Sequence, residues 1–219
     1  MMLALDALFD RATLTALQQE AAALVFEDGG ATAGRFAGTV KANDQAAASD
    51  IRDAIFSRVT QALHAHPVFA SAARPAALTP MILSRYRAGQ TYGLHVDNAL
   101  MGGMRTDLSF TLFLSDPDSY EGGALILEDS FEAQAVKLPA GSVFLYPSTR
   151  LHRVEPVRSG TRLAVVGWVQ SHIRCAQQRE VLFDLDRAIE ALYAAEGKTP
   201  LFDTFAKTRS NLLRMWVGA

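Results

Sequence analysis

The chain has 219 residues and a mass of 23.7 kDa, and 49% of its residues are hydrophobic while 20% are charged. This length and composition predict one globular domain with an appendage, and they exclude a disordered chain, a collagen-like repeat and a coiled-coil rod. The 21 basic and 23 acidic residues give a formal charge of -2 without any block of like charge. We therefore expect neither nucleic acid nor a membrane as a partner, and we favour a small molecule or a protein.

Three features of the sequence bear on the compartment. Cys175 is the one cysteine and cannot form an internal disulfide bond, and the first residues lack the basic region and long apolar core of a signal peptide. No apolar run approaches the roughly 18 to 20 residues that cross a bilayer. We therefore expect a soluble, cytoplasmic protein. We assign no chemistry to Cys175, because a single cysteine without an activating neighbour is usually inert.

Residues 1–77 predict an N-terminal helical support region. Apolar residues recur at helical spacing up to Leu24, and two glycines then supply a stop. Ser49 or Asp50 can cap the next helix, in which apolar residues recur every four positions as far as Leu63. Prolines end this second helix.

Residues 78–174 predict a β core. Short runs of β-favouring residues alternate with turn signals rich in Gly, Pro and Asp, which is the pattern of an antiparallel sandwich or barrel. The expected strands are 81–86, 108–114, 124–127, 142–146 and 163–169. A jelly roll is the architecture that this pattern favours.

Residues 175–219 predict a C-terminal helical module, because helical periodicity returns after Gln170 and is interrupted only around Gly197 and Pro200. The fold class is therefore α+β, with a jelly-roll core between N-terminal helices and a C-terminal module. The apolar faces of the last two helices are compatible with a homo-oligomer.

The strongest chemical signal is the segment that contains His95 and Asp97. Residues two apart in an extended segment face the same side, so both side chains can reach one atom, and His152 follows a later strand. Two imidazoles and one carboxylate leave half of an octahedron open, as Fe(II) requires for a chelating co-substrate and dioxygen. The alternative is a chance His-x-Asp pair with a surface histidine at a strand end.

Arg162 adds a fourth position. It begins the strand 163–169, which we expect to form a hairpin with the strand before His152 through a turn at 156–160. A guanidinium there can hold a carboxylate bidentately, as a dicarboxylate such as 2-oxoglutarate requires. The alternative is a surface arginine after a turn.

With these four residues in alternating β runs, the sequence resembles the 2-oxoglutarate and Fe(II)-dependent dioxygenases of the prolyl 4-hydroxylase type. It is most similar to the PKHD-type hydroxylases, a bacterial group linked to iron uptake. The segments that carry this similarity are 121–125, 139–142, 145–148, 151–154, 167–174, 178–186 and 211–216. The resemblance covers nearly the whole chain and is weakest over the first thirty residues.

The resemblance implies a double-stranded β-helix in which His95, Asp97 and His152 bind Fe(II) and Arg162 holds the distal carboxylate of 2-oxoglutarate. It implies a hydroxylase that converts 2-oxoglutarate and O2 to succinate and CO2, with L-ascorbate restoring Fe(II). By position, Tyr86 resembles the tyrosine that hydrogen-bonds the co-substrate in related hydroxylases. The substrate, a small molecule or a peptide, is not revealed.

One position departs from the family pattern. Related prolyl hydroxylases place a second tyrosine near the co-substrate carboxylate, where this chain has Phe113, which donates no hydrogen bond. Tyr86 or Thr111 would then have to serve, and Tyr92 is a further candidate for the pocket wall. We expect segment 99–104 to act as a lid.

Two other classes of function compete with the dioxygenase. One is a noncatalytic jelly-roll sensor or interaction protein that binds a metal or 2-oxoglutarate, which would not need Arg162 beside an open metal site. The other is a cupin-like zinc or manganese enzyme, which the two histidine ligands and the arginine disfavour. The remaining histidines, His64, His66 and His172, are expected to be structural or solvated.

Overall fold

A computed structural model describes the chain except for residues 33, 35, 36, 130 and 219. Its largest element is a nine-stranded sheet in which every pairing of the described strands is antiparallel. The order along this sheet is β1 (Leu3–Leu5), β14 (Val143–Pro147), β10 (Leu108–Phe113), β16 (Val157–Ser171), β6 (Ile82–Arg87), β4 (Asp44–Ala46) and β2 (Phe26–Asp28). Two further strands pair with β16, namely β5 (Pro75–Leu78) and β11 (Tyr120–Gly122).

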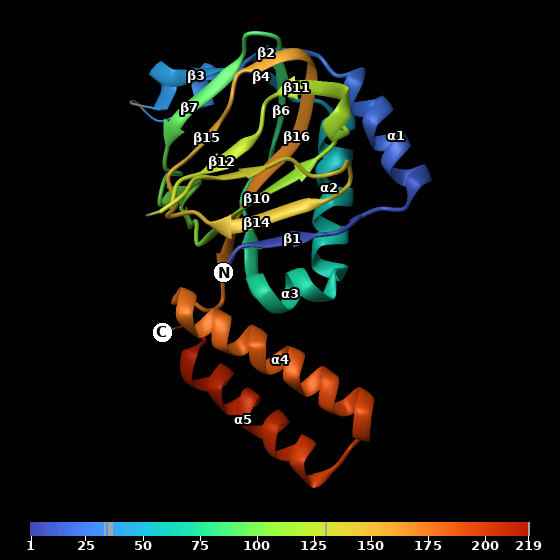
Figure 1. Ribbon diagram of the computed structural model, residues 1–219, viewed down its shortest axis with the longest axis vertical. Helices are drawn as coiled ribbons and strands as arrows, with labels where there is room; N and C mark the ends of the chain where they lie inside the picture. Colours follow the sequence, from blue (N-terminus) through green and yellow to red (C-terminus); the bar gives the residue numbers. More distant parts are fainter. Residues whose placement is uncertain (33, 35–36, 130, 219) are drawn as a thin grey trace.

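A second, five-stranded sheet lies across from the large one (Figure 1). Its order is β13 (Gln134–Val136), β12 (Leu125–Leu127), β15 (His152–Val154), β7 (Thr91–His95) and β3 (Lys41–Ala42). A short hairpin, β8 (Leu100–Met101) with β9 (Met104–Arg105), follows β7. Residues of both sheets line one cavity, so the cavity lies between the sheets.

Strand register decides which residues of the large sheet face the cavity. Directly opposed residues of paired strands point to the same face, and successive residues alternate. Ser109 is opposite Trp168, and Tyr86 is opposite Arg162, which places these polar side chains on the cavity face. Leu83 lies on the alternate face and packs in the main hydrophobic core.

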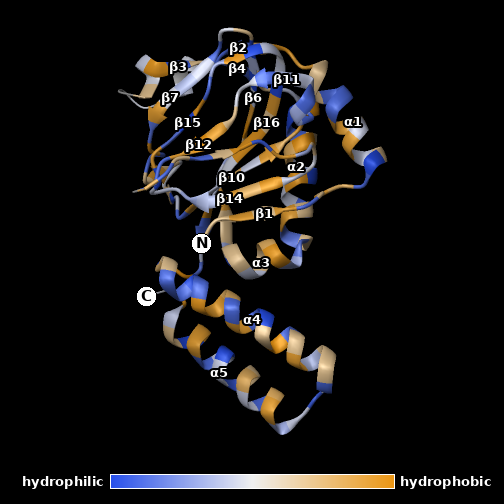
Figure 2. Cartoon of the chain, viewed as in Figure 1, coloured by the Kyte–Doolittle hydropathy of each residue, from blue (hydrophilic) through white to orange (hydrophobic). Residues whose placement is uncertain are grey.

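The outer face of the large sheet is covered by three helices, α1 (Arg11–Ala22), α2 (Asp50–Ala65) and α3 (Pro67–Ala73). Ile55 and Phe69 are fully buried against the sheet, and Phe69 meets Phe110 edge to face with ring centroids 6.3 Å apart. Ser49 caps α2 by accepting a hydrogen bond from the backbone of Arg52, as the sequence predicts. Figure 2 shows hydrophobic residues concentrated in the strands and on the helix faces beside them.

The first 77 residues are not wholly helical, because they also supply β1 to β4 at the edges of both sheets. The expected hairpin between the strands before and after His152 is also wrong. The strand that carries Arg162, β16, pairs with β10 and β6, and β10 separates it from β14. Arg162 nevertheless reaches the cavity, because its neighbour across the sheet is Tyr86 of β6.

The last two helices, α4 (Ala176–Glu196) and α5 (Pro200–Trp216), form a hairpin that projects from the β core (Figure 1). Asp186 of α4 joins three elements by accepting hydrogen bonds from Ser71 and Arg74 at the end of α3 and from Arg209 of α5. In the part of the chain that the structure describes, no helix is long and apolar enough to cross a bilayer.

Candidate metal and co-substrate site

The structure brings the three predicted metal ligands together. His95 ends β7, His152 begins β15 directly opposite it, and Asp97 follows β7 by two residues. One ligand atom from each residue lies within 4.8 Å of the others, and the Nε2 atom of His152 is 3.8 Å from Asp97 Oδ2. One strand pair and its extension therefore position the whole triad.

Hydrogen bonds orient both imidazoles. The Nδ1 atom of His95 donates to the carbonyl oxygen of Gly93 at 2.8 Å, and that of His152 donates to the carbonyl oxygen of Arg150 at 2.9 Å. Because a carbonyl oxygen only accepts, each Nδ1 carries a proton, and Nε2 is the ring nitrogen that faces the other ligands. Burial and the neighbouring His152 lower the pKa of His95 to about 4, so this imidazole is neutral at pH 7.

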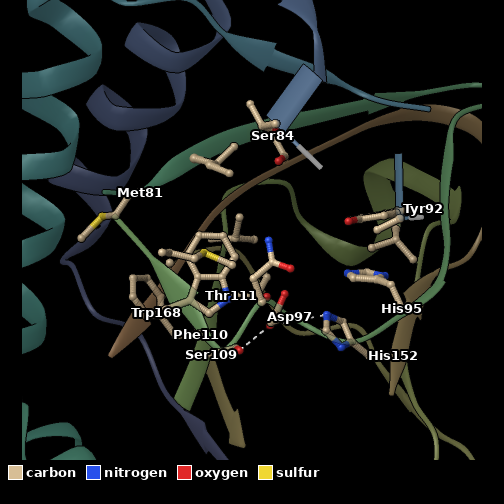
Figure 3. A pocket seen from close by; sticks show the side chains of 18 of the residues that line it. Met81, Ser84, Tyr92, His95, Asp97, Ser109, Phe110, Thr111, His152 and Trp168 are labelled. Atoms are coloured by element: carbon tan, nitrogen blue, oxygen red, sulfur yellow. Dashed lines mark hydrogen bonds and ion pairs between the residues drawn. The ribbon is translucent and has the colours of Figure 1, made fainter. Parts of the chain in front are cut away.

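Asp97 is held by Ser109, which Ser148 contacts in turn, and the sequence reasoning missed both serines. Ser109 Oγ donates to Asp97 Oδ2 at 2.6 Å (Figure 3). Ser148 Oγ lies 2.8 Å from Ser109 Oγ. Both serines are buried. The signal that marks Ser109 in the sequence is a hydroxyl in an otherwise apolar strand, on the same face as Thr111.

Aromatic rings pack against the two imidazoles. Tyr92 stacks on His95 with ring centroids 3.6 Å apart, and Tyr146 meets His152 edge to face at 5.3 Å. Burial raises the pKa of Tyr86 to about 12 and raises the pKa of Tyr92 and Tyr146 as well. These phenols therefore keep their protons at neutral pH and can donate hydrogen bonds into the cavity.

Arg162 lies at the base of the same cavity and is only 1% exposed. Its guanidinium is 5.4 Å from the ring centres of both Tyr86 and Phe113. The Phe113 ring thus packs beside the cation and offers no hydrogen-bond donor there. Among the described residues Arg162 forms no ion pair, and its buried Nε has no hydrogen-bond partner.

These features fit the two groups that the sequence suggests. A buried guanidinium without an ion-pair partner costs free energy unless an anion binds it, and a dicarboxylate supplies that anion. Two imidazoles and a carboxylate on one side of a cavity are the ligand set of a divalent metal with open coordination positions. The lack of an ion pair to Arg162 among the described residues is the observation that favours a dicarboxylate over water, because water leaves the positive charge unmatched.

The cavity has a volume of about 500 Å³ and a polar and an apolar part. Figure 3 shows Met81, Phe110 and Trp168 on one side of Asp97, with His95 and His152 on the other. The size suits a small ligand or one residue of a peptide next to a bound co-substrate.

The expected wall residue Tyr92 lines the cavity, and so do Val96 and Val154. Leu94 and Leu151 beside the ligands are about half exposed and lie outside the lining. The segment expected to form a lid, 99–104, overlaps the β8–β9 hairpin, whose Leu100 and Met101 border the cavity.

His64, His66 and His172 do not line the cavity. His66 instead caps α3, where its Nδ1 accepts a hydrogen bond from the backbone of Phe69.

Comparison with known proteins agrees with this geometry. Residues 81–170 match the 2OG-Fe(II) oxygenase superfamily, and residues 177–218 match the PKHD-type hydroxylase C-terminal domain. A PKHD-type hydroxylase from Maricaulis maris is 52% identical over 191 residues, which are 87% of each chain. Another from Synechococcus elongatus is 50% identical over 221 residues and covers 99% of each chain.

Solved structures share the fold at low sequence identity. A prolyl-4-hydroxylase from Pseudomonas putida has a TM-score of 0.55 at 18% identity and covers 78% of this chain and 92% of its own. A prolyl hydroxylase from Trichoplax adhaerens, solved with a hypoxia inducible factor peptide fragment, has a TM-score of 0.61 at 15% identity, with 83% and 86% covered. These likenesses show the mixed α and β fold around a large antiparallel sheet.

Proposed function

The chain belongs to the PKHD-type hydroxylases, within the 2OG-Fe(II) oxygenases, and from this membership we propose that it hydroxylates a small-molecule or peptidyl substrate in the cavity between its two sheets. The enzyme class is that of a 2-oxoglutarate-dependent dioxygenase. The observation that carries the proposal is the placement of a buried, unpaired Arg162 in the same cavity as the His95, Asp97 and His152 triad.

In this proposal His95, Asp97 and His152 hold Fe(II), and Arg162 and Tyr86 hold the distal carboxylate of 2-oxoglutarate. With both groups bound, the site would couple O2 activation to conversion of 2-oxoglutarate to succinate and CO2. Arg162 and Tyr86 are directly opposed residues of β16 and β6, so one cross-strand pair supplies a cation and a phenol donor for the same carboxylate.

The protein's own contribution is orientation and exclusion of water. Backbone carbonyls fix both imidazoles, and the hydrogen bond from Ser109 orients the carboxylate of Asp97. Leu125 and Val154 give the cavity apolar walls beside the triad, where they would limit the access of water. The neutral phenols of Tyr86 and Tyr146 add donors without adding negative charge.

Further parts of the proposal are supported by the sequence resemblance or by the arrangement of the sheets. The two facing antiparallel sheets support a double-stranded β-helix, or jelly roll, as the architecture of residues 78–174. The resemblance supports L-ascorbate as the reductant that restores Fe(II) and a link to iron uptake. A cytoplasmic location, a homo-oligomer and the division at residues 77 and 174 remain predictions from the sequence.

Binding of 2-oxoglutarate tests the proposal without knowledge of the substrate. Anaerobic protein is titrated with 2-oxoglutarate with and without Fe(II), and binding is followed by calorimetry and by the visible absorbance of the iron chelate. We expect metal-dependent binding in the wild type and at least a tenfold loss in Arg162→Ala. Arg158→Ala is the matched control, because Arg158 is an exposed arginine of the same strand.

Each outcome has a defined meaning. The absence of metal-dependent binding in the wild type overturns the proposal, and so does unchanged binding in Arg162→Ala. Succinate release in the presence of O2 and ascorbate then separates an enzyme from a noncatalytic sensor, which would bind both groups without turnover. Circular dichroism of each variant shows whether the fold is retained.

A further inference from the structure

A second cation lines the cavity. Among the described lining residues, only Lys41 and Arg162 carry a positive charge, and Asp97 carries the one negative charge. Lys41 begins β3 at the edge of the smaller sheet, opposite Tyr92 of β7. Its ammonium is 5.1 Å from the centre of the Tyr92 ring, which in turn stacks on His95. Lys41 is therefore two contacts away from the metal site.

The Lys41 ammonium is fixed in place. Its Nζ donates to Thr32 Oγ1 at 2.8 Å, and the same oxygen accepts from Gln45 Nε2 at 2.8 Å. The Thr32 hydroxyl donates in turn to the carbonyl oxygen of Gly29 at 3.1 Å. This network orients the ammonium with one of its three donors and leaves two donors for a ligand.

No carboxylate pairs with Lys41 among the residues that the structure describes. Asp97 and Asp28 attract the ammonium from a distance, but burial is the larger influence and lowers the pKa of Lys41 to about 8. By contrast, Arg85 on β6 of the large sheet pairs with Asp44 at 2.8 Å. A half-buried ammonium beside a cavity and without a counter-ion is costly to maintain, which indicates that a ligand supplies the counter-ion.

Charge balance in the loaded site favours a singly charged ligand. The two charges of Fe(II) and the one of Arg162 are matched by Asp97 and the two carboxylates of 2-oxoglutarate. Among the described residues that line the cavity, Lys41 is then the one charge that no opposite charge balances. The cavity also offers an apolar region formed by Met81, Phe110 and Trp168.

We infer that the substrate of this enzyme carries a singly charged anionic group, such as a carboxylate, that pairs with Lys41 while its apolar part enters the Met81, Phe110 and Trp168 region. This inference rests on the proposed function, because it takes the metal and 2-oxoglutarate as bound. Lys41 is thus a specificity-determining residue, which selects acids over their neutral analogues.

Matched probes test the inference without the natural substrate. The probes are phenylacetate, 3-phenylpropanoate and 4-phenylbutanoate, each paired with its carboxamide, which has the same shape without the charge. Each probe is titrated by calorimetry into protein saturated with Mn(II) and 2-oxoglutarate in the absence of oxygen. Titrations at two concentrations of 2-oxoglutarate exclude competition for Arg162. The variants are Lys41→Gln, Lys41→Arg and, as the control, Lys137→Gln.

Lys137 is a matched control because its ammonium also lies over a tyrosine ring, 4.0 Å from the centre of Tyr120, but outside the cavity lining. We expect the wild type, Lys41→Arg and Lys137→Gln to bind at least one acid tenfold more tightly than its amide. We expect Lys41→Gln to bring that ratio within twofold while metal-dependent 2-oxoglutarate binding stays within twofold of wild type.

Three results would overturn the inference. They are an acid-to-amide ratio near one for every pair in the wild type, an unchanged ratio in Lys41→Gln, and a loss of 2-oxoglutarate binding in Lys41→Gln, which would assign Lys41 to the co-substrate. Failure of the proposed function is distinguishable, since the wild type itself would then bind no 2-oxoglutarate in a metal-dependent manner.

Discussion

The β core and the C-terminal hairpin both bury charged side chains, but they treat them differently. In the hairpin, Asp186 accepts hydrogen bonds from Arg74 and Arg209, and Arg179 donates to the carbonyl oxygens of Ile173 and Arg174. In the core, the Nε of Arg162 has no partner. Arg74 also has an unpaired Nε, but its guanidinium is already bound to Asp186 at 2.6 Å.

This difference separates structural charges from functional ones. A buried charge that finds its partners within the chain holds elements together, whereas one that faces a cavity without a partner is available to a ligand. By this criterion the Asp186 network attaches the hairpin, whereas Arg162 in the cavity of the core is available to a ligand. Substitutions in the Asp186 network should therefore lower the free energy of unfolding. Substitutions in the cavity should instead lower the affinity for metal and 2-oxoglutarate.

Removal of a metal ligand should have the largest effect. In His152→Ala we expect a loss of at least about 100-fold in metal-dependent 2-oxoglutarate binding and in succinate release, because an imidazole ligand contributes more than the partners that orient it. The metal-free variant should still fold, since the imidazole of His152 hydrogen-bonds to the carbonyl oxygen of Arg150 within its own turn. Calorimetry and circular dichroism measure the two effects. Wild-type affinity in this variant would remove His152 from the site.

Asp186→Asn should lower the stability of the fold and leave ligand binding intact, the reverse of His152→Ala. Arg74 would lose its carboxylate in a largely buried position, and we expect a loss of about 3 kcal/mol in the free energy of unfolding. This value is the lower end of the roughly 3 to 5 kcal/mol that breaking a buried ion pair costs, because the second partner, Arg209, is about a third exposed. Urea unfolding measures the loss, and the folded fraction should bind metal and 2-oxoglutarate normally.

Asp184→Asn is the control for this substitution, because Asp184 is an exposed residue of the same helix. Burial opposes ionisation of Asp186, but Arg209, Ser71 and Arg74 lower the pKa of its carboxyl group below the usual value of 3.8. The contribution of Asp186 is therefore fully present at neutral pH and is lost only as the pH falls below about 4. Equal stability of the two variants would contradict a structural role for the Asp186 network.

The contrast between the regions also shows what sequence reasoning reached. Alternating patterns located β6, β10, β14 and part of β16, and the motif spacing named the three ligands that the structure brings together. The short strands β1 to β4 were not located, because segments of two or three residues have no detectable periodicity and depend on pairing with other strands.

Sequence reasoning could not supply strand order, and the function of individual polar residues depends on it. The expected hairpin before Arg162 was wrong because β10 inserts between β14 and β16. Only the resulting register places Ser109 behind Asp97 and Tyr86 opposite Arg162. Lys41 has no motif at all and is recognisable only from its place in the cavity.

Ser109→Ala tests one consequence of that register, the hydrogen bond from Ser109 to Asp97, and its expected effect is smaller than that of removing a metal ligand. The substitution removes the hydrogen bond to Asp97 Oδ2 while leaving all three ligands in place. We expect a tenfold to hundredfold loss in metal affinity, the usual effect of removing a partner that orients a ligand. Metal titration monitored by calorimetry measures it. Ser159→Ala, at an exposed position of β16, should bind as the wild type, and equal affinity of both variants would show that Ser109 does not orient Asp97.

Lys41→Met should give the smallest effect, a gain in the free energy of unfolding. An unpaired charge at the cavity is expected to lower stability, whereas the paired Asp186 raises it. The pKa of Lys41 in the folded state, about 8, lies below the ordinary lysine value of 10.5, so between these values the unfolded chain binds more protons than the folded one. Wild-type stability should therefore contain a penalty that is complete below pH 8 and disappears as the pH rises towards 10.5. After a discount for partial exposure we expect Lys41→Met to be about 1 kcal/mol more stable than the wild type at pH 7.

Urea unfolding at pH 7, 8, 9 and 10 should show this difference in stability shrink as the pH rises, while Lys137→Met shows no such difference. A stability difference that stays constant with pH, or a variant less stable than the wild type, would contradict this prediction. Lys41 would then be a structural charge like Asp186 and not one that is free to bind a ligand.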